Sequence, residues 1–438
     1  MIQSIHIKNF RSILDETIDF SFAEGKAPNG HEAMRRIPFL QKQGEKFRAV
    51  PLLAFFGANA AGKSNLLRAV DAFRRRAIDQ VPENYPFYQP DKLHGPLRPT
   101  SMDITFFAGG MNLRYVLEDD RFAIHREELE ADGKRVFSIR GPDADLAPLA
   151  TDAYPLDHLK QYLRVECLPT PDGFYSRPFL AVLGRNYAGL DARVKAAYDF
   201  FKDGLVPSAT DKLDMGHFSI DIRQLAETRK TDEQAVLADI AALVRKLDVP
   251  IAALSIVRSK GPIPAPPPDA TPSYQRWFVR KDEAGQQVNL HLQTLHRDEE
   301  GREISFRLNE EESDGTQNLV FLLARMLLAL ERGSTVFVDE LDRSLHPLLV
   351  RSLLNLFVDR TLNPNGARLV FTTHCTDLLD NSILRLSEVA IVSNGLRTGT
   401  RVRRLTDLKK EGVPLRNVTD FRKNYLDGFY AGVPFPTL

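Results

Sequence analysis

The spacing of apolar side chains changes repeatedly along the chain, and each change predicts a strand or a helix. Residues 2–10 alternate between apolar and polar side chains, which is typical of a half-buried strand. Residues 52–56 are all apolar and follow Pro51, a position where a strand tolerates the missing N–H. From 65 to 73, apolar side chains recur at helical spacing. The first part of the chain therefore predicts a strand, a tight turn and a helix in succession.

Short strands follow this unit. Runs of strand length cover 101–107, 112–117 and 122–126, and Gly109-Gly110 provides a turn between the first two. They predict a small antiparallel sheet. Surface connections are expected where the chain is polar or rich in glycine and proline, at 24–46, 81–99 and 261–272.

The middle of the chain, from 148 to 272, changes character. Helical spacing over 179–205 and 233–247 predicts packed helices. The sequence holds no sustained heptads there, so we do not expect a long coiled-coil arm. Residues 274–279 and 288–295 then predict two further strands.

The last third alternates between helix and strand. The pattern predicts an apolar helix, a short strand, a helix that begins near Pro347 and another strand, over 318–330, 335–338, 348–357 and 368–372. The fold class is therefore α/β. We expect a mixed central sheet flanked by helices, with an antiparallel β subdomain.

These elements suggest a discontinuous domain organisation. An N-terminal lobe over 1–147 and a C-terminal lobe over 273–438 are expected to form one domain. The mainly helical region and its proline-rich linker, 148–272, are expected to be inserted between the two lobes.

Composition narrows the class of protein. The 438 residues have an apolar fraction of 43% and a formal net charge of zero, without the basic surplus that is usual in nucleic-acid-binding proteins. Two cysteines exclude a disulfide framework or a cysteine-rich zinc site. The first residues lack a signal-peptide pattern, and no apolar run reaches membrane-spanning length. We therefore expect a cytoplasmic protein with no membrane partner.

The turn after 52–56 carries the clearest chemistry. It fits the phosphate-loop pattern G-x-x-x-x-G-K-[ST], in which backbone N–H groups surround phosphates at a helix N-terminus. Lys63 would reach the β- and γ-phosphates of ATP, and Ser64 would hold Mg²⁺. The predicted nucleotide-binding residues of this loop are Gly57, Ala58, Asn59, Ala60, Ala61, Gly62, Lys63, Ser64 and Asn65. A chance glycine turn is the alternative, but a strand before it and a helix after it argue against chance.

Two acidic residues follow the predicted strand at 335–338. Alone, Asp339 and Glu340 would be read as a surface pair at a strand end. Beside a phosphate loop, Asp339 is predicted to hold the Mg²⁺ shell with Ser64, and Glu340 to activate the attacking water. His374 follows the next strand, where a side chain points into a ligand crevice. A single histidine is more often structural, but its place after this motif series favours a catalytic role at the γ-phosphate.

The order of these motifs resembles the ABC-type ATPases of the SMC, RecF and OLD group. More narrowly, it resembles the RloA/AbiLi-like ATPases of bacterial defence systems. Three phrases carry the narrow resemblance: Glu312-Ser-Asp-Gly-Thr316, Asp339-Glu-Leu-Asp-Arg-Ser-Leu-His-Pro347 and Tyr425-Leu-Asp-Gly-Phe-Tyr-Ala-Gly-Val-Pro434. The opening Ile7-Lys-Asn-Phe-Arg-Ser12 is also similar to that of the family.

The resemblance implies a P-loop ABC-type ATPase head and further nucleotide-binding residues. By position they are Asn9, Arg11, Ser313, Gly315 and Asp342. Spacing alone would favour a solvated charge for Arg11. The resemblance also implies a head-to-tail homodimer with ATP at its interface, where Ser313 and Gly315 cap the partner's nucleotide; assembly beyond the dimer is left open.

The chain also departs from the family pattern. Its signature stretch reads Ser-Asp-Gly-Thr-Gln from residue 313, whereas the transporter-like form is Leu-Ser-Gly-Gly-Gln. Cys375 follows His374 where an acidic residue is usual, and no glutamine lid is assigned after the first predicted helix.

Two functions remain open at this point. In the first, the protein is a Mg-ATP-dependent switch in antiphage defence that controls a separately encoded nuclease or toxin, with a phage protein as trigger. Only a short tail follows His374, which leads us to expect no nuclease activity from this chain. In the second, it binds DNA in repair, in the manner of RecF. Basic strips for that role are Arg74 to Arg76 and a second group formed by Arg401, Arg403, Arg404, Lys409 and Lys410, although charge runs are usually solvated surface.

Overall fold

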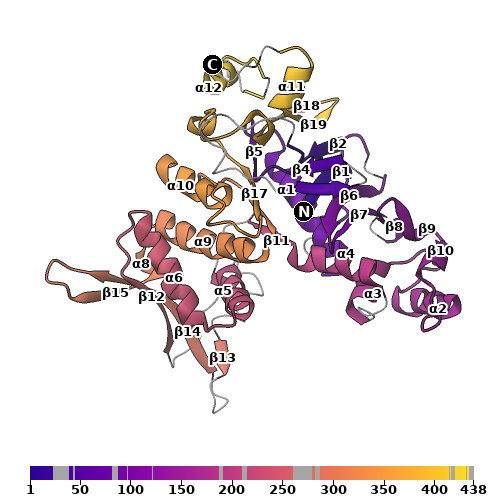
Figure 1. Ribbon diagram of the computed structural model, residues 1–438, viewed down its shortest axis with the longest axis horizontal. Helices are drawn as coiled ribbons and strands as arrows, with labels where there is room; N and C mark the ends of the chain where they lie inside the picture. Colours follow the sequence, from indigo (N-terminus) through magenta and orange to yellow (C-terminus); the bar gives the residue numbers. More distant parts are fainter. Residues whose placement is uncertain are drawn as a thin grey trace.

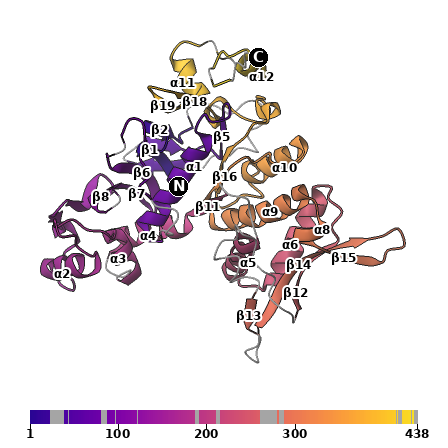
Figure 2. The same cartoon turned by 180° about the vertical axis from the view of Figure 1, so that it is seen from behind.

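A computed structural model gives the fold of the chain (Figures 1 and 2). It describes residues 1–22, 39–42, 45–80, 87–95, 97–120, 122–186, 191–209, 215–259, 279–281, 287–413, 415, 420–430 and 432–433. The expected connection at 261–272 and nearly all of the expected strand at 274–279 lie outside these residues. In the part of the chain that is described, no helix is both long and apolar enough to cross a membrane.

A six-stranded sheet forms the centre of the molecule. Its order is β11-β16-β17-β5-β18-β19; the first five strands are parallel and β19 is antiparallel to β18. The strands span Leu205–Ala209, Thr335–Val338, Arg368–Thr372, Leu52–Phe56, Val389–Gly395 and Gly399–Arg404, in that order. The predicted strands at 52–56, 335–338 and 368–372 are confirmed with the same bounds.

Both faces of this sheet are buried around β5, which explains why that strand is wholly apolar in sequence. In β5, Leu52 and Phe56 face one hydrophobic cluster, whereas Leu53 and Phe55 face the other. The first cluster is built with helices α5 (Met215–Arg229), α6 (Glu233–Lys246), α9 (Asp314–Arg332) and α10 (Pro347–Val358). The second is built with α1 (Lys63–Ala77), α3 (Phe179–Asn186), α4 (Ala192–Asp203) and a second sheet. The central sheet therefore lies between two layers.

The second sheet is antiparallel and has seven strands, in the order β10-β9-β8-β7-β6-β1-β2. In chain order they are β1 (Ile2–Phe10), β2 (Ile13–Asp19), β6 (Thr100–Ala108), β7 (Met111–Asp119), β8 (Ile124–Ala131), β9 (Lys134–Arg140) and β10 (Asp143–Asp145). The predicted antiparallel subdomain is confirmed, and the first strand of the chain lies inside it. Hairpin β3–β4 (Phe39–Lys42 and Glu45–Arg48) begins within the stretch 24–46, which was expected to be a surface loop, and extends two residues beyond it.

The middle region is less separate than we expected. Helix α2 (Leu156–Glu166), α3 and α4 follow the seven-stranded sheet, and β11 pairs in parallel with β16 of the central sheet. A self-contained insertion would not supply a strand to that sheet. The predicted helical runs at 179–205 and 233–247 correspond to α3 with α4 and to α6.

A third sheet projects from the body, on the side away from the seven-stranded sheet (Figures 1 and 2). We call it the arm: β12 (Ala253–Ser259), β13 (Val279–Lys281), β14 (Gln287–Arg297) and β15 (Glu303–Arg307). β14 pairs with the other three strands. Short helix α8 (Leu308–Glu311) leads from the arm into α9.

The last described helices come after the central sheet in the chain. Helix α10 begins at Pro347, as predicted. Three-residue 3₁₀ helices lie at Ala147–Leu149, Thr376–Leu378 and Leu386–Glu388. Helices α11 (Leu405–Lys410) and α12 (Phe421–Leu426) follow β19.

Candidate functional site

The phosphate loop joins the carboxyl end of β5 to the N-terminus of α1, and two of its glycines are required by close packing. A Cβ added to Gly57 would lie 2.3 Å from the carbonyl oxygen of Val392 in β18. One added to Gly62 would overlap Thr400 in β19, and Gly62 also has a φ of 101°, which side chains with a Cβ rarely adopt. These two glycines therefore let the loop lie directly against β18 and β19.

Helix α1 presents an open N-terminus to this loop. Its N-cap Gly62 supplies no side-chain hydrogen bond, and the first turn carries no acidic residue. Three arginines occupy the last turn, where cations complement the helix dipole. The partial positive charge at the start of α1 is therefore available to an anion, as a phosphate site requires.

The Lys63 side chain is folded back onto its own loop. Its Nζ donates hydrogen bonds to the carbonyl oxygens of Gly57, at 2.8 Å, and Ala58, at 3.0 Å. Burial lowers the pKa of the Lys63 ammonium, although the carboxylates of Asp339 and its neighbours oppose this shift. Since an ammonium binds a charged phosphate more strongly than a neutral carbonyl, Lys63 is poised to exchange these partners for a phosphate.

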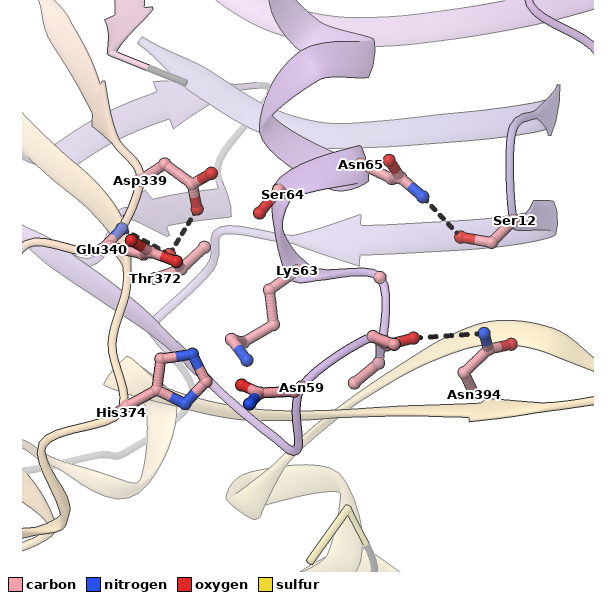
Figure 3. A pocket seen from close by; sticks show the side chains of 13 residues that line it. Ser12, Asn59, Lys63, Ser64, Asn65, Asp339, Glu340, Thr372, His374 and Asn394 are labelled. Atoms are coloured by element: carbon pink, nitrogen blue, oxygen red, sulfur yellow. Dashed lines mark hydrogen bonds between the residues drawn. The ribbon is translucent and has the colours of Figure 1, made fainter. Parts of the chain in front are cut away.

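Thr372 connects the two acidic residues that follow β16. Because β17 lies between β16 and β5, its last residue faces both neighbouring strand ends. The Thr372 hydroxyl donates to Asp339 Oδ1 at 2.6 Å and accepts the backbone N–H of Glu340 at 2.7 Å (Figure 3). Glu340 has a φ of 49°, a strained conformation for a residue with a side chain. One hydroxyl thus fixes both Asp339 and the unusual backbone of Glu340.

His374 and Asp342 lie next to this pair. The backbone N–H of His374 points to both carboxylate oxygens of Asp342, each at 3.3 Å. Figure 3 shows the His374 ring beside the end of Lys63 and near Asn59. Asp342 thus contacts the backbone that carries His374, whereas the imidazole itself faces the cleft.

Polar side chains form the opposite wall. Asn65 Nδ2 donates to Ser12 Oγ at 2.8 Å (Figure 3). Ser12 Oγ in turn lies 2.7 Å from Thr400 Oγ1. Asn394 Nδ2 lies 3.3 Å from the carbonyl oxygen of Ala60. This wall brings together β18, β19, the turn after β1 and the phosphate loop.

Together these groups enclose a cleft of about 300 Å³, within the size range of small-molecule sites. Its walls are Ser12, Asn59, Ala60, Ala61, Gly62, Lys63, Ser64, Asn65, Asp339, Glu340, Thr372, His374 and Asn394. The sequence reasoning missed Ser12, Thr372 and Asn394. Only the strand order, which is not visible in a local pattern, brings these three residues to the loop.

Two predicted residues have other partners. Asn9 Nδ2 donates to the carbonyl oxygens of Gly95 and Arg98, and Asn9 Oδ1 accepts the N–H of Asp91. Its amide therefore holds the connection before β6 and does not line the cleft. Arg11 lies closer, because its Nη1 is 3.4 Å from Asn65 Oδ1, although its Nε donates to Gln89.

The signature residues lie away from the cleft of their own chain. Ser313 caps α9 by accepting the N–H of Thr316 at 3.1 Å, and its side chain is exposed. A Cβ on Gly315 would lie 2.6 Å from the carbonyl oxygen of Ser344, so this helix packs against the segment after Glu340. Gly57, Ala58 and Asp342 also lie outside the walls of the cleft.

The donor set of the cleft fits Mg²⁺. The hydroxyl of Ser64 and the carboxylate of Asp339 are oxygen ligands of the kind that Mg²⁺ prefers, and both line the cleft. Mg²⁺ is bound in proteins by few such ligands together with substrate phosphates. Among the described residues, no group of three or more His, Cys, Asp and Glu side chains could hold a metal by itself.

Comparison with known proteins gives one family. Residues 52–163 and 192–380 match the family described as "AAA domain, putative AbiEii toxin, Type IV TA system", so more than half of the chain is matched. No curated protein matches the sequence.

Several solved structures match as well. The SMC head domain from Thermotoga maritima is 14% identical, with a TM-score of 0.37, over 92% of this chain and 98% of that chain. The Smc head domain with an extended coiled coil from Pyrococcus furiosus, bound to the C-terminal domain of ScpA, is 14% identical, with a TM-score of 0.36, over 94% and 98%.

Proposed function

The chain belongs to this AAA-domain family, and we propose that it binds and hydrolyses Mg-ATP as a homodimeric switch that controls a separately encoded effector in antiphage defence. One observation carries the ATPase part of the proposal. Lys63, Ser64, Asp339, Glu340 and His374 come from three strand ends far apart in sequence, yet all five line one cleft.

Each of these side chains has a task in the proposed reaction. The loop N–H groups and Lys63 bind the phosphates, and Ser64 with Asp339 holds Mg²⁺, which neutralises phosphate charge when bound. Glu340 accepts a proton from the attacking water. His374 orients that water or the γ-phosphate by hydrogen bonding.

The two-fold arrangement is proposed from the position of the signature. Ser313 is exposed and Gly315 lies at the start of α9, outside the walls of their own cleft. A head-to-tail homodimer would bring both residues to the nucleotide of the partner subunit, and each subunit would complete the other's site. Binding of ATP would then close the dimer and hydrolysis would open it.

The domain boundaries belong to the same proposal. We propose that residues 1–147 and 273–438 are the two halves of one ATPase domain. The region 148–272 contains helices α2 to α6 and two strands. Strand β11 belongs to the central sheet of the ATPase domain, and β12 belongs to the arm.

The defence role is supported by two resemblances. The family description names a putative AbiEii toxin and a type IV TA (toxin–antitoxin) system. The RloA/AbiLi-like phrases of the chain indicate the same kind of system, with a nuclease or toxin as effector and a phage protein as trigger. We propose that the ATPase holds or releases the effector according to its nucleotide state.

The alternative, ATP-dependent DNA binding in repair, draws little support from the two basic strips. Arg401 contacts Glu16 at 3.3 Å, Arg404 contacts Asp19 at 2.6 Å and Arg403 contacts Glu411. A guanidinium paired with a carboxylate is a poor phosphate ligand because its charge is already neutralised.

The arginines of the other strip, Arg74 to Arg76, also have partners within the protein. Arg75 contacts Asp71 at 2.9 Å and Arg76 contacts Asp119, while Arg74 donates to the carbonyl oxygen of Leu205 at 3.0 Å. Arg74 and Arg76 anchor α1 to its neighbours, whereas Arg75 pairs with Asp71 within the helix.

The test is a co-purification from the native host with Glu340→Gln as bait. Loss of the base should slow hydrolysis by about 100-fold or more while ATP still binds, so that the closed dimer accumulates. We expect a nuclease or another toxic protein to accompany it in stoichiometric amount, with Lys63→Ala, which should not bind ATP, as the control.

Recovery of DNA alone would favour the repair alternative. DNA degradation by the purified chain that disappears in Glu340→Gln would overturn the proposal of a separate effector.

A further inference from the structure

The C-terminal tail lies against the phosphate loop. We define the tail as residues 420–430 and 432–433, which include α12. The backbone N–H of Ala58, the second residue of the loop, donates to the carbonyl oxygen of Gly432 at 2.7 Å. This hydrogen bond joins positions 374 residues apart in sequence (432 − 58), and one of them lies inside the loop that is proposed to bind ATP.

The peptide groups around Ala58 are held on both sides. On one side the tail carbonyl of Gly432 accepts the Ala58 N–H. On the other, Lys63 Nζ donates to the Ala58 carbonyl oxygen at 3.0 Å. If Lys63 moves to bind a phosphate, its hydrogen bond to the Ala58 carbonyl is lost. The hydrogen bond from Ala58 N–H to the Gly432 carbonyl then still holds this end of the loop. The tail therefore contributes to the loop geometry that a nucleotide meets.

Close packing fixes the tail at this position. Gly432 has a φ of 77°, and an added Cβ would lie 2.8 Å from Ile391 Cγ2 and 2.9 Å from the carbonyl oxygen of Val392. Gly57 of the loop is pressed against the same Val392 carbonyl. The loop and the tail thus pack on one peptide of β18, each through a glycine.

Aromatic side chains hold the rest of the tail in the core. Phe421, Tyr425 and Tyr430 are all buried. The Tyr425 ring meets the Phe56 ring edge-on, with a centroid separation of 6.3 Å, and Phe56 is the last residue of β5 before the loop. Aromatic pairs of this geometry add to the stabilisation from burial. The tail therefore contacts both the strand that enters the loop and the loop itself.

We propose that the tail is a strap that sets the conformation of the phosphate loop, with Gly432 and Tyr425 as positioning residues for nucleotide binding. The inference rests on the proposed ATP binding. It goes beyond that proposal because neither residue lines the cleft. Since the strap acts on the loop and not on Glu340 or His374, it should govern affinity for ATP more than the rate of the chemical step.

The test compares two glycine-to-alanine variants with the same backbone requirement. Gly432→Ala forces a shift of the tail carbonyl. Gly301→Ala is the matched control, because Gly301 has a φ of 79° but no atom within 4 Å of an added Cβ, at the tip of the arm hairpin. Gly432→Ala should raise the Kd and KM for ATP roughly 3- to 10-fold, as expected for one lost hydrogen bond, with kcat at saturating ATP within about twofold. Gly301→Ala should leave both constants unchanged.

Two further measurements keep the inference testable if Gly432→Ala folds poorly. Tyr425→Ala should weaken ATP binding. Tyr425→Phe keeps the ring against Phe56 and loses only the long hydrogen bond of the Tyr425 hydroxyl to the Gly432 carbonyl oxygen, at 3.5 Å, so it should restore most of the binding. Amide exchange in the peptide that contains Ala58 should be faster in both disruptive variants than in the wild type. Failure of the wild type to bind ATP would overturn the proposed function. Binding by the wild type, with the same Kd in Gly432→Ala, Gly301→Ala and Tyr425→Ala, would overturn the strap alone.

Discussion

Thr372 positions two acidic residues of the cleft through a single hydroxyl. It is fully buried, and its hydroxyl is used twice, as a donor to Asp339 and as an acceptor from the N–H of Glu340. The second hydrogen bond holds a residue whose φ of 49° is unfavourable. Without it, Glu340 would be free to relax toward an ordinary backbone conformation and move its carboxylate.

We predict that Thr372→Val lowers kcat for ATP hydrolysis by about 10- to 100-fold, because a displaced general base loses most of its contribution. Valine has nearly the same shape as threonine, so the core should be little disturbed. ATP affinity should change less than kcat, since Lys63 and the loop remain intact and only Asp339, among the proposed binding residues, loses a hydrogen bond. Thr372→Ser keeps the hydroxyl and should recover most of the activity. Equal rates for the valine and serine variants would show that the hydroxyl has no such role.

The sequence predicted some of these residues and not others, for a physical reason. Lys63 belongs to a local pattern whose spacing carries its chemistry. Asp339 and Glu340 were found as an acidic pair at a strand end, and the presence of the phosphate loop gave them their predicted roles. Thr372 and Asn394 belong to no such pattern. They reach the cleft because β17 and β18 flank β5 in the sheet, which depends on pairing across the whole chain.

At the scale of elements, Glu128 ties β8 to β9 in the seven-stranded sheet. Its carboxylate accepts hydrogen bonds from Arg126 at 2.6 Å, Arg140 at 2.6 Å and Ser138 at 3.1 Å. Burial alone would raise the pKa of Glu128, but these hydrogen bonds lower it to about 2. Its folded pKa is therefore below its ordinary value of 4.5, so its stabilising effect is present above about pH 4.5 and is lost as the pH falls toward 2.

We predict that Glu128→Gln unfolds more easily than the wild type at pH 7, by about 1–2 kcal/mol after allowance for the solvent exposure of Arg140. The difference should shrink steadily between about pH 4.5 and 2, as the wild-type carboxyl becomes protonated. Urea unfolding at several pH values measures it. If the difference in unfolding free energy stays constant with pH, Glu128 stabilises the fold through packing and not through its ionised carboxylate.

The arm is connected to the signature through one glutamate. Glu312 Oε1 accepts hydrogen bonds from Thr294 Oγ1 and, at 2.6 Å, from His296 Nε2, and both partners lie on β14. The next residue is Ser313, which caps α9. A displacement of β14 would therefore be transmitted to the start of α9, where the proposed partner contact begins.

We predict that Glu312→Ala reduces ATP hydrolysis about tenfold, because the signature is no longer held against β14 and the closed dimer forms less often. Binding of ATP should be unaffected, since Glu312 does not line the cleft. Glu310→Ala is the control, because Glu310 contacts only the exposed side chain of Arg307, at 2.9 Å, among the ion pairs of the described residues. Equal hydrolysis rates in the two variants would show that the contact between the arm and the signature does not affect hydrolysis.

Some elements could be predicted from the sequence and one important strand could not. The runs at 52–56, 335–338 and 368–372 are continuous, apolar and bounded by turn residues, which marks buried parallel strands. β11 reads Leu-Val-Pro-Ser-Ala, a stretch for which the sequence predicted no strand. It lies at the edge of the central sheet, the position at which a strand accommodates proline.

At the scale of the whole molecule, the proposed dimer places the two halves of each active site on different chains. In one subunit, Lys63 and Glu340 line the cleft, whereas Ser313 is exposed at the start of α9. A chain that lacks Lys63 should therefore still offer a working signature. A chain with a blocked signature should still offer a working phosphate loop.

Mixing two inactive variants tests this arrangement directly. Lys63→Ala and Ser313→Arg should each hydrolyse ATP at less than about 1% of the wild-type rate, because every homodimer then lacks one half of both sites. In an equal mixture, half of the dimers are mixed and each contains one intact site, so about a quarter of the wild-type rate should return. Lys63→Ala mixed with Glu340→Gln is the control: both changes lie in the cleft, so a mixed dimer contains no intact site and should remain inactive. A mixture of Lys63→Ala and Ser313→Arg that stays inactive, although both proteins are folded and exchange subunits, would rule out the head-to-tail dimer.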